Sequence, residues 1–143
     1  MALHPGDSPG FLLWHATLRW QREVTAAIGP LGLTHVQFVL LASTWWLNTT
    51  GQRPNQVALS RHAGTDVKMT SQVLRALEHK GLIERSPDPV DTRAKRLRVT
   101  SAGAELAPRA VAAVERVDAA FFAPVAERHP MALLRELAGV DLG

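Results

Sequence analysis

The chain has 143 residues, of which 46% are hydrophobic and 20% charged, so its composition is that of one globular domain rather than of a disordered segment. It contains no cysteine, which excludes disulfides, thiolate metal sites and cysteine catalysis. The formal net charge is only +3, yet residues 51–100 hold ten Lys and Arg against five Asp and Glu. A basic excess confined to one segment favours a polyanionic partner over a uniformly solvated surface, which is the alternative explanation.

No window of the sequence approaches the roughly 20 apolar residues that span a bilayer, and the apolar run 11–14 is too short for a signal peptide. We therefore expect a cytoplasmic protein without a membrane partner, and a single domain over residues 1–143.

The first helix is expected to begin at Ser8-Pro9, a cap residue followed by proline, and to end near Ile28 before Gly29-Pro30. A second helix is expected from Thr34, because Gln37 three residues later completes a capping box. The stretch 36–47 is apolar nearly all round, which is typical of a helix at the buried centre of a fold.

Two shorter helices follow the loop 48–53. Asn55 is expected to cap a helix over 56–62, and Gly64-Thr65 forms a turn into another helix that ends before Gly81. In this last helix the residues at spacing i, i+3, i+4 and i+7 from Thr70 form an apolar face, while the other face is polar and basic. Two helices joined by a short turn containing glycine predict a helix-turn-helix.

After Gly81 the period changes to two, which predicts strands over 82–86 and 96–100 joined by a turn, 87–95. A fifth helix is expected from Thr100 or Ser101, kinked at Pro108, and a last one over 131–140. The sequence therefore predicts a mainly α fold with a small β-hairpin wing, a winged helix-turn-helix over 34–100. The helices over 8–30 and 101–143 carry more apolar surface than this module can cover, so we expect them to form a dimerisation region.

Three stretches resemble the MarR family of bacterial transcription regulators. They are residues 32–41 (GLTHVQFVLL), residues 69–85 (MTSQVLRALEHKGLIER), and the wing residues Asp88, Asp91 and Arg93 followed by 99–103 (VTSAG). The resemblance covers nearly the whole chain. It implies a homodimer that binds a palindromic operator on double-stranded DNA, is usually a repressor, and is usually released by a small aromatic or phenolic ligand.

The resemblance also assigns DNA-binding residues. The groove-facing positions of the family fall on five residues of the fourth helix: Lys68, Met69, Ser71, Gln72 and Arg75. The wing arginine falls on Arg93, and Asp91 is the carboxylate that orients the basic residues of the wing. Met69 stands where the family often has a small polar residue.

The chemistry of these side chains agrees with the assignment. Gln72 can bond adenine bidentately, and Lys68 and Arg75 can donate to guanine or phosphate. Arg93, Lys95, Arg96 and Arg98 can supply phosphate contacts. The alternatives are that Arg75 forms an ion pair with Glu78 or Glu84, that Arg96 and Arg98 are ordinary solvent-facing strand residues, and that Thr70 only packs.

All four tryptophans lie in the first two predicted helices. The resemblance implies an effector pocket between the first, second and fifth helices, so we hypothesise that Trp14, His15, Trp45 and Trp46 contribute to it. The alternative is that these tryptophans are core residues.

No other functional site is predicted. The six histidines show no metal-ligand spacing, so we expect no metal and no cofactor. Catalytic and phosphate-binding motifs are missing, and Ser60, His62 and Asp66 are expected to be exposed polar residues, so we expect no enzyme. A protein-interaction module that keeps the winged fold, an activator and an effector-independent regulator remain open alternatives.

Overall fold

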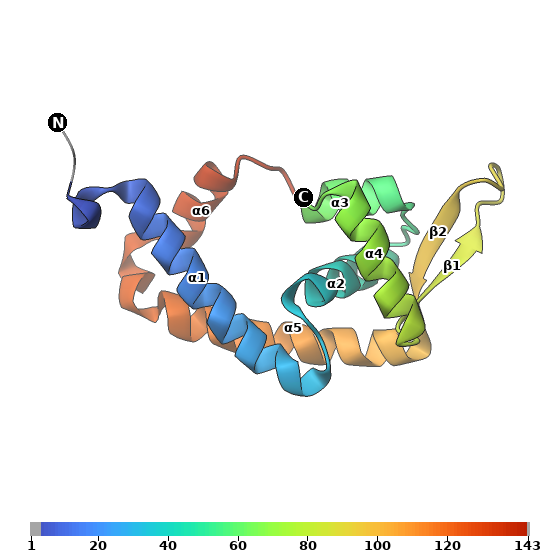
Figure 1. The fold of residues 1–143 in the computed structure, drawn as a ribbon, viewed down its shortest axis with the longest axis horizontal. Coiled ribbons are helices and arrows are strands. Elements are labelled where there is room, and N and C mark those ends of the chain that lie inside the picture. The colour runs from blue at the N-terminus through green and yellow to red at the C-terminus, as the bar shows by residue number, and fades with distance from the viewer. Residues whose placement is uncertain (1–3, 143) are drawn as a thin grey trace.

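The computed structural model describes residues 4–142 as six α-helices and one β-hairpin (Figure 1). In chain order the elements are α1 (Pro9–Ile28), α2 (His35–Thr49), α3 (Gln56–Ala63), α4 (Val67–His79), β1 (Ile83–Pro87), β2 (Lys95–Val99), α5 (Ser101–Phe122) and α6 (Pro130–Ala138). Short 3-10 helices lie at Pro5–Asp7, Gly29–Leu31 and Ala123–Arg128. The mainly α fold with a small hairpin is therefore confirmed.

The helices begin where the sequence places their caps. The hydroxyl of Ser8 accepts from the amide of Phe11 at the start of α1. At the start of α2, Thr34 and Gln37 bond each other's amides reciprocally, each at 3.2 Å. Such caps satisfy amides that have no partner inside the helix, and each stabilises a helix by about 1 kcal/mol. The local sequence therefore determines where α1 and α2 begin.

The core forms around α2, which packs against α3, α4, α5 and β2. Leu40, Leu41, Thr44 and Leu47 are its buried residues, and Leu74 and Leu77 of α4 belong to the same cluster. The stretch 36–47 lies at the centre of the fold as expected, but Trp46 within it is 45% exposed and so is not a core residue. Its ring instead stacks on His62 of α3, with centroids 5.9 Å apart and planes 16° apart.

The hairpin is antiparallel, with Ile83 opposite Val99 and Pro87 opposite Lys95. The strand β1 lies one residue later than expected and β2 one residue earlier. At the end of β2, Thr100 serves as the N-cap of α5 rather than as the last strand residue. The helix α5 runs on through Pro108 to Phe122 and forms one long side of the molecule in Figure 1.

The first half of α1 and the whole of α6 lie away from the core, at the end of the molecule opposite the hairpin (Figure 1). Only Val24 and Ile28 of α1 are buried, and no residue of α6 is. The large exposed hydrophobic residues of these two helices are Phe11, Leu12, Leu13, Trp14, Met131, Leu133 and Leu137.

By length and apolar content, the individual helices of residues 4–142 fall short of a membrane span. No single helix there is both long and apolar enough to cross a bilayer. The segments Pro9–Leu31 and His35–Thr49 satisfy the length and composition requirement only when taken together, and they are bent by 73°.

Candidate nucleic-acid interface

Three residues join α3 to α4 in a tight turn. Gly64 takes the left-handed conformation, with φ of 71°, and Asp66 caps α4 by accepting from the amide of Met69 at 2.9 Å. Thr70 is fully buried, and its hydroxyl lies 2.7 Å from that of Thr65. The interpretation of Thr70 as a packing residue is therefore correct, and the turn fixes the angle between the two helices.

One face of α4 is polar, basic and accessible, and we call it the recognition face. It contains Lys68, Met69, Gln72 and Arg75, which are exposed, and Ser71, which is half-buried. Leu74 and Leu77 on the opposite face are completely buried. The structure therefore brings all five predicted groove-facing residues to one surface.

The alternative that Arg75 forms an ion pair with Glu78 or Glu84 is wrong, because both carboxylates have other partners. Glu78 pairs with Arg85, and Glu84 pairs with Arg98 across the hairpin. Arg75 donates to the hydroxyl of Ser71, one turn earlier, at 3.1 Å. In the described part of the chain, neither Lys68 nor Arg75 forms an ion pair, so their charge is not neutralised by the protein.

Asp88 organises the turn between the strands. Its carboxylate is buried and accepts from the amides of Val90 and Asp91, at 2.8 and 3.1 Å, and from the guanidinium of Arg96. The two backbone hydrogen bonds, that of Val90 first, and the nearby Arg96 hold the pKa of Asp88 below its ordinary value. Sequence reasoning used Asp88 only as part of a motif, although an Asp flanked by prolines is a typical turn residue.

Asp91 lies beside Arg93 at the tip of the wing, by which we mean β1, β2 and the turn between them. Its Oδ1 accepts from the amide of Arg93 at 3.1 Å and from its Nε at 3.2 Å. The Arg93 side chain is 91% exposed, and Lys95 at the start of β2 is exposed as well. Two cations that were predicted to contact phosphates are thus exposed at the wing, and a carboxylate restrains one of them.

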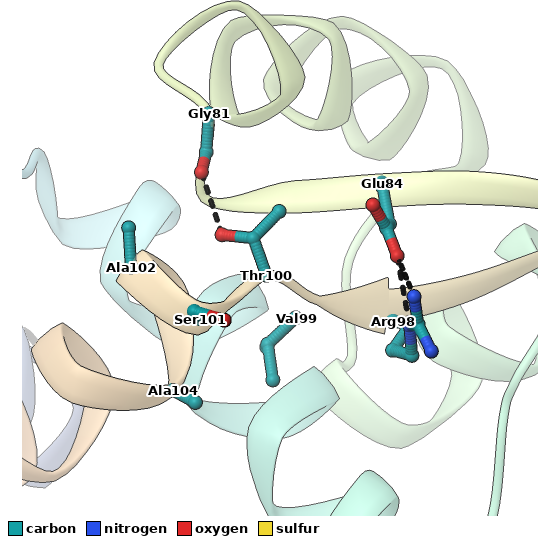
Figure 2. Close-up of a pocket in the computed structure, with 8 residues that line it drawn as sticks. All are labelled: Gly81, Glu84, Arg98, Val99, Thr100, Ser101, Ala102 and Ala104. Atoms are coloured by element: carbon teal, nitrogen blue, oxygen red, sulfur yellow. Dashed lines mark hydrogen bonds and ion pairs between the residues drawn. The ribbon is translucent and has the colours of Figure 1, made fainter.

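Arg96 and Arg98 both have protein partners. The Nε of Arg98 donates to Glu84 on the opposite strand at 2.8 Å, as Figure 2 shows. Arg96 donates to Asp88 and to the carbonyl of Arg53, the latter at 2.9 Å. Both side chains therefore link parts of the wing to each other or to the loop before α3, and both lie on strand β2 as expected.

Arg85 was not selected from the sequence, yet it links the wing to the helix-turn-helix. Its Nε donates to Glu78 of α4 at 2.6 Å, and its Nη1 lies 3.4 Å from Oε1 of Gln56 of α3. The side-chain Nε2 of Gln56 donates in turn to the backbone carbonyl of Val67. One side chain of β1 therefore contacts both helices of the helix-turn-helix.

At the base of the wing, two residues of the Val-Thr-Ser-Ala-Gly motif, Thr100 and Gly103, make close contacts with the start of β1, and Figure 2 shows the hydrogen bond from Thr100 to Gly81. The hydroxyl of Thr100 donates to the carbonyl of Gly81 at 2.6 Å and accepts from the amide of Gly103 at 3.1 Å. A Cβ on Gly103 would lie only 2.1 Å from the carbonyl oxygen of Leu82. Only glycine allows the first turn of α5 to pack so closely against the start of β1.

The outer edge of β2 is held by the end of α2. The side-chain amide of Asn48 donates to the carbonyl of Leu97 at 3.3 Å, and its oxygen accepts from the amide of Val99 at 2.9 Å. The amide of Leu97 donates to the carbonyl of Pro54 at 2.8 Å. The wing is thus anchored along its length rather than projecting from its base alone.

The four residues hypothesised to form an effector pocket lie in different surroundings. Trp14 and His15 are exposed on α1, where the ring of His15 meets that of Phe11 edge-on at 4.6 Å. Trp45 is half-buried against the core, and Trp46 stacks on His62 as described above. Within this single chain, the two residues of α1 and the two of α2 contact different neighbours.

A different tryptophan lies where α1, α2 and α5 meet. The indole nitrogen of Trp20 donates to Oδ1 of Asp118 at 2.8 Å, and its ring meets His35 edge-on at 5.1 Å. Burial lowers the pKa of His35, while the nearby charge of Asp118 opposes this shift. Trp20 and Asp118 also line an apolar hollow of about 490 Å³ between α1, α5 and α6.

The residues considered for catalysis are part of the helix-turn-helix. Ser60 is buried and donates to the carbonyl of Val57, so the expectation that it is exposed is wrong. His62 is half-buried beneath Trp46, and Asp66 is exposed but serves as the cap of α4. Among residues 4–142, no three His, Cys, Asp or Glu side chains are placed to hold a metal ion.

The helix-turn-helix, its basic recognition face and the anchored hairpin define a winged helix-turn-helix protein. The MarR family model matches residues 33–95. The regulator YdcH of Bacillus subtilis is 47% identical over 119 residues, which cover 83% of this chain and 81% of YdcH. The chain belongs to the MarR family and is a helix-turn-helix transcriptional regulator.

Solved structures share the fold. The transcriptional repressor CouR from Rhodococcus jostii, bound to a 23-mer DNA duplex, is 27% identical with a TM-score of 0.81, and the match covers 97% of this chain and 98% of CouR. BpsR from Bordetella bronchiseptica is 24% identical with a TM-score of 0.84, over 99% of this chain and all of BpsR. The family comprises transcriptional regulators, which supports the expectation that the chain is not an enzyme.

Proposed function

We propose that the chain is a cytoplasmic, homodimeric repressor that binds a pseudo-palindromic operator and is released by a small aromatic ligand. The observation that carries this proposal is the recognition face, where Lys68, Gln72 and Arg75 are accessible and the two cations have no carboxylate partner among residues 4–142. A helix of this kind fits the major groove, with Gln72 bonding adenine and the two cations donating to guanine or phosphate. Met69 and Ser71 complete the surface that faces the bases.

In the proposed complex the wing contacts the adjacent backbone. Arg93 and Lys95 are exposed at its tip, and Asp91 restrains Arg93 through two hydrogen bonds. Phosphate contacts of this type supply affinity without sequence information, so they position the recognition face over the operator.

The dimer is supported by the apolar surface of α1 and α6, which the single chain leaves exposed. A concentration of exposed apolar side chains on two helices is typical of an interface, and two-fold symmetry would place two copies of α4 on successive major grooves. The half-sites should then lie about one helical turn, roughly 10 bp, apart. The CouR complex, which contains duplex DNA, has the same fold.

Release by an aromatic ligand is supported by the aromatic and polar groups near the junction of α1, α2 and α5. Trp20 of α1, His35 of α2 and Asp118 of α5 meet there. The four residues hypothesised from the sequence lie on α1 and α2: Trp14, His15, Trp45 and Trp46. The DNA binding of BpsR, which shares the fold, is regulated by 6-hydroxynicotinic acid. A ligand that binds one spacing of the two recognition faces better than another would shift the population away from the DNA-binding form.

The test is fluorescence anisotropy of the protein on its own upstream DNA across a salt series, beside Arg93→Ala. We expect the affinity of the wild-type protein for this DNA to fall steeply with salt. Arg93→Ala should still dimerise but bind more weakly and with a shallower salt slope. Weak, salt-independent binding of both proteins to upstream DNA and to selected random DNA would overturn the proposal and favour a protein partner.

A further inference from the structure

Two apolar side chains are exposed in the first turn of α4, on an otherwise polar surface. Val67 is 49% exposed and Met69 is 41% exposed. Neither belongs to the hydrophobic core cluster, to which Val73, Leu74 and Leu77 of the same helix contribute. An exposed apolar residue is unremarkable on its own, but here it lies on the surface that the proposed function assigns to the operator.

The position of Met69 on the helix is specific. Lys68, Gln72 and Arg75 form one row, because they are four and then three residues apart. Met69 precedes Gln72 by three residues, so its side chain lies next to that of Gln72 on one side of the row. Its backbone amide is already used, since it donates to Asp66. The thioether side chain is therefore the only part of Met69 left to contact a partner.

The chemistry of the major groove offers an apolar group for such a side chain. Among the four bases, only thymine presents a methyl group there, and apolar side chains contact it. Methionine is unbranched and adapts its shape to the surface that it meets. The adjacent cations, Lys68 and Arg75, favour a nucleic acid over an apolar protein surface as the partner of this turn.

We propose that Met69 contacts a thymine methyl group in each operator half-site, next to the base that Gln72 bonds. This inference rests on the proposed function and adds a specificity determinant to it. Met69 then contributes to base discrimination through packing, although it has no strong hydrogen-bonding group. The half-site should contain a thymine whose methyl group is required, adjacent to an A·T pair.

The experiment replaces thymine by uracil, which removes the methyl group and keeps the base-pairing edge. An operator is first isolated by selection from random duplex DNA, and each half-site thymine is then replaced in turn. We expect one replacement to weaken binding by the wild-type protein about fourfold per half-site, which corresponds to the roughly 0.8 kcal/mol gained by burying one methyl group. Met69→Ala should bind the thymine operator several-fold more weakly, and the same uracil replacement should not weaken it further.

The matched control is Val90→Ala, because Val90 is 96% exposed at the wing and equally apolar. Thymine methyl groups lie in the major groove, so this variant should keep the full uracil effect. Circular dichroism should show both variants folded, since both residues are exposed. If uracil weakens the wild type and Met69→Ala by the same factor at every thymine, the inference is overturned while the proposed function stands. If no DNA is bound in a salt-dependent way, the proposed function fails and the inference fails with it.

Discussion

The Nε of Arg85 lies 2.6 Å from Oε1 of Glu78, and this ion pair joins β1 of the wing to the last turn of α4. Both side chains are mostly shielded from solvent, so the pair is less screened than a surface ion pair. Because Arg85 also contacts Gln56 of α3, it fixes the wing relative to both helices of the helix-turn-helix.

The first prediction concerns this pair. Arg85→Met should keep the volume and the helical core but release the wing, because the charge that holds Glu78 is lost. We expect operator binding to weaken about tenfold, with a salt slope close to that of the wild type, since Arg85 is not assigned to a phosphate. Anisotropy titrations at three salt concentrations measure both quantities. A salt slope reduced as strongly as in Arg93→Ala would instead make Arg85 a direct phosphate contact.

The second prediction concerns the close approach at Gly103. A Cβ there would lie 2.1 Å from the carbonyl oxygen of Leu82, so the start of α5 and the base of the wing must separate in Gly103→Ala. We expect a loss of about 2–3 kcal/mol in the free energy of unfolding, as in overpacked cores. Urea denaturation followed by circular dichroism measures it.

Gly10→Ala is the matched control for this substitution. Gly10 also lies in the first turn of a helix, α1, and no atom lies within 4 Å of the position of an added Cβ. The free energy of unfolding of Gly10→Ala should equal that of the wild type or slightly exceed it, because alanine is a better helix former than glycine. Equal stability of the two alanine variants would show that the contact at Leu82 is not tight in solution.

The third prediction concerns pH. Burial lowers the pKa of His35 in the folded chain, so the folded state binds this proton less readily than the unfolded state does. Stability linked to His35 is therefore complete above the ordinary pKa of about 6.5 and is lost as pH falls through the lower pKa of the folded state. Urea midpoints between pH 7.5 and 5 should fall less in His35→Gln than in the wild type. Direct NMR titration of His35 provides the check, and a pKa above 6.5 would contradict the expected direction.

The fourth prediction concerns Trp20 as a reporter. Its indole donates to Asp118 and touches His35, so a ligand at this junction should change its emission. We expect Trp20→Phe to lose most of the fluorescence response to a panel of phenolic compounds, while Trp46→Phe keeps it. A response that survives in Trp20→Phe and disappears in Trp46→Phe would place the ligand near α3 instead.

Sequence patterns predicted the structural features that depend on residues close together in the chain. The caps at Ser8, Thr34 and Asn55 and the two faces of α4 follow from spacings within one or two helical turns. Helical periodicity predicted a polar, basic face on α4, and the resemblance to the MarR family assigned the groove-facing residues on it, Met69 included.

The contacts that sequence reasoning missed join residues far apart in the chain. Trp20 and Asp118 are 98 positions apart, and no local pattern distinguishes Trp20 from the other three tryptophans. Asp88 and Arg96 are only eight positions apart, but their pairing depends on the path of an irregular turn. The expected position of Trp46 in the core failed for a related reason, because hydrophobicity does not say which side of α2 the neighbouring helices leave uncovered.

The anchoring of β2 by Asn48 has a mechanical consequence. His35 and Asn48 lie at opposite ends of α2, about 20 Å apart at 1.5 Å per residue, and the packed helix between them is stiff. Asn48 bonds both Leu97 and Val99 of β2. Because these two hydrogen bonds fix β2 to the end of α2, we expect a displacement of α2 near His35 to change the position of the wing that carries Arg93.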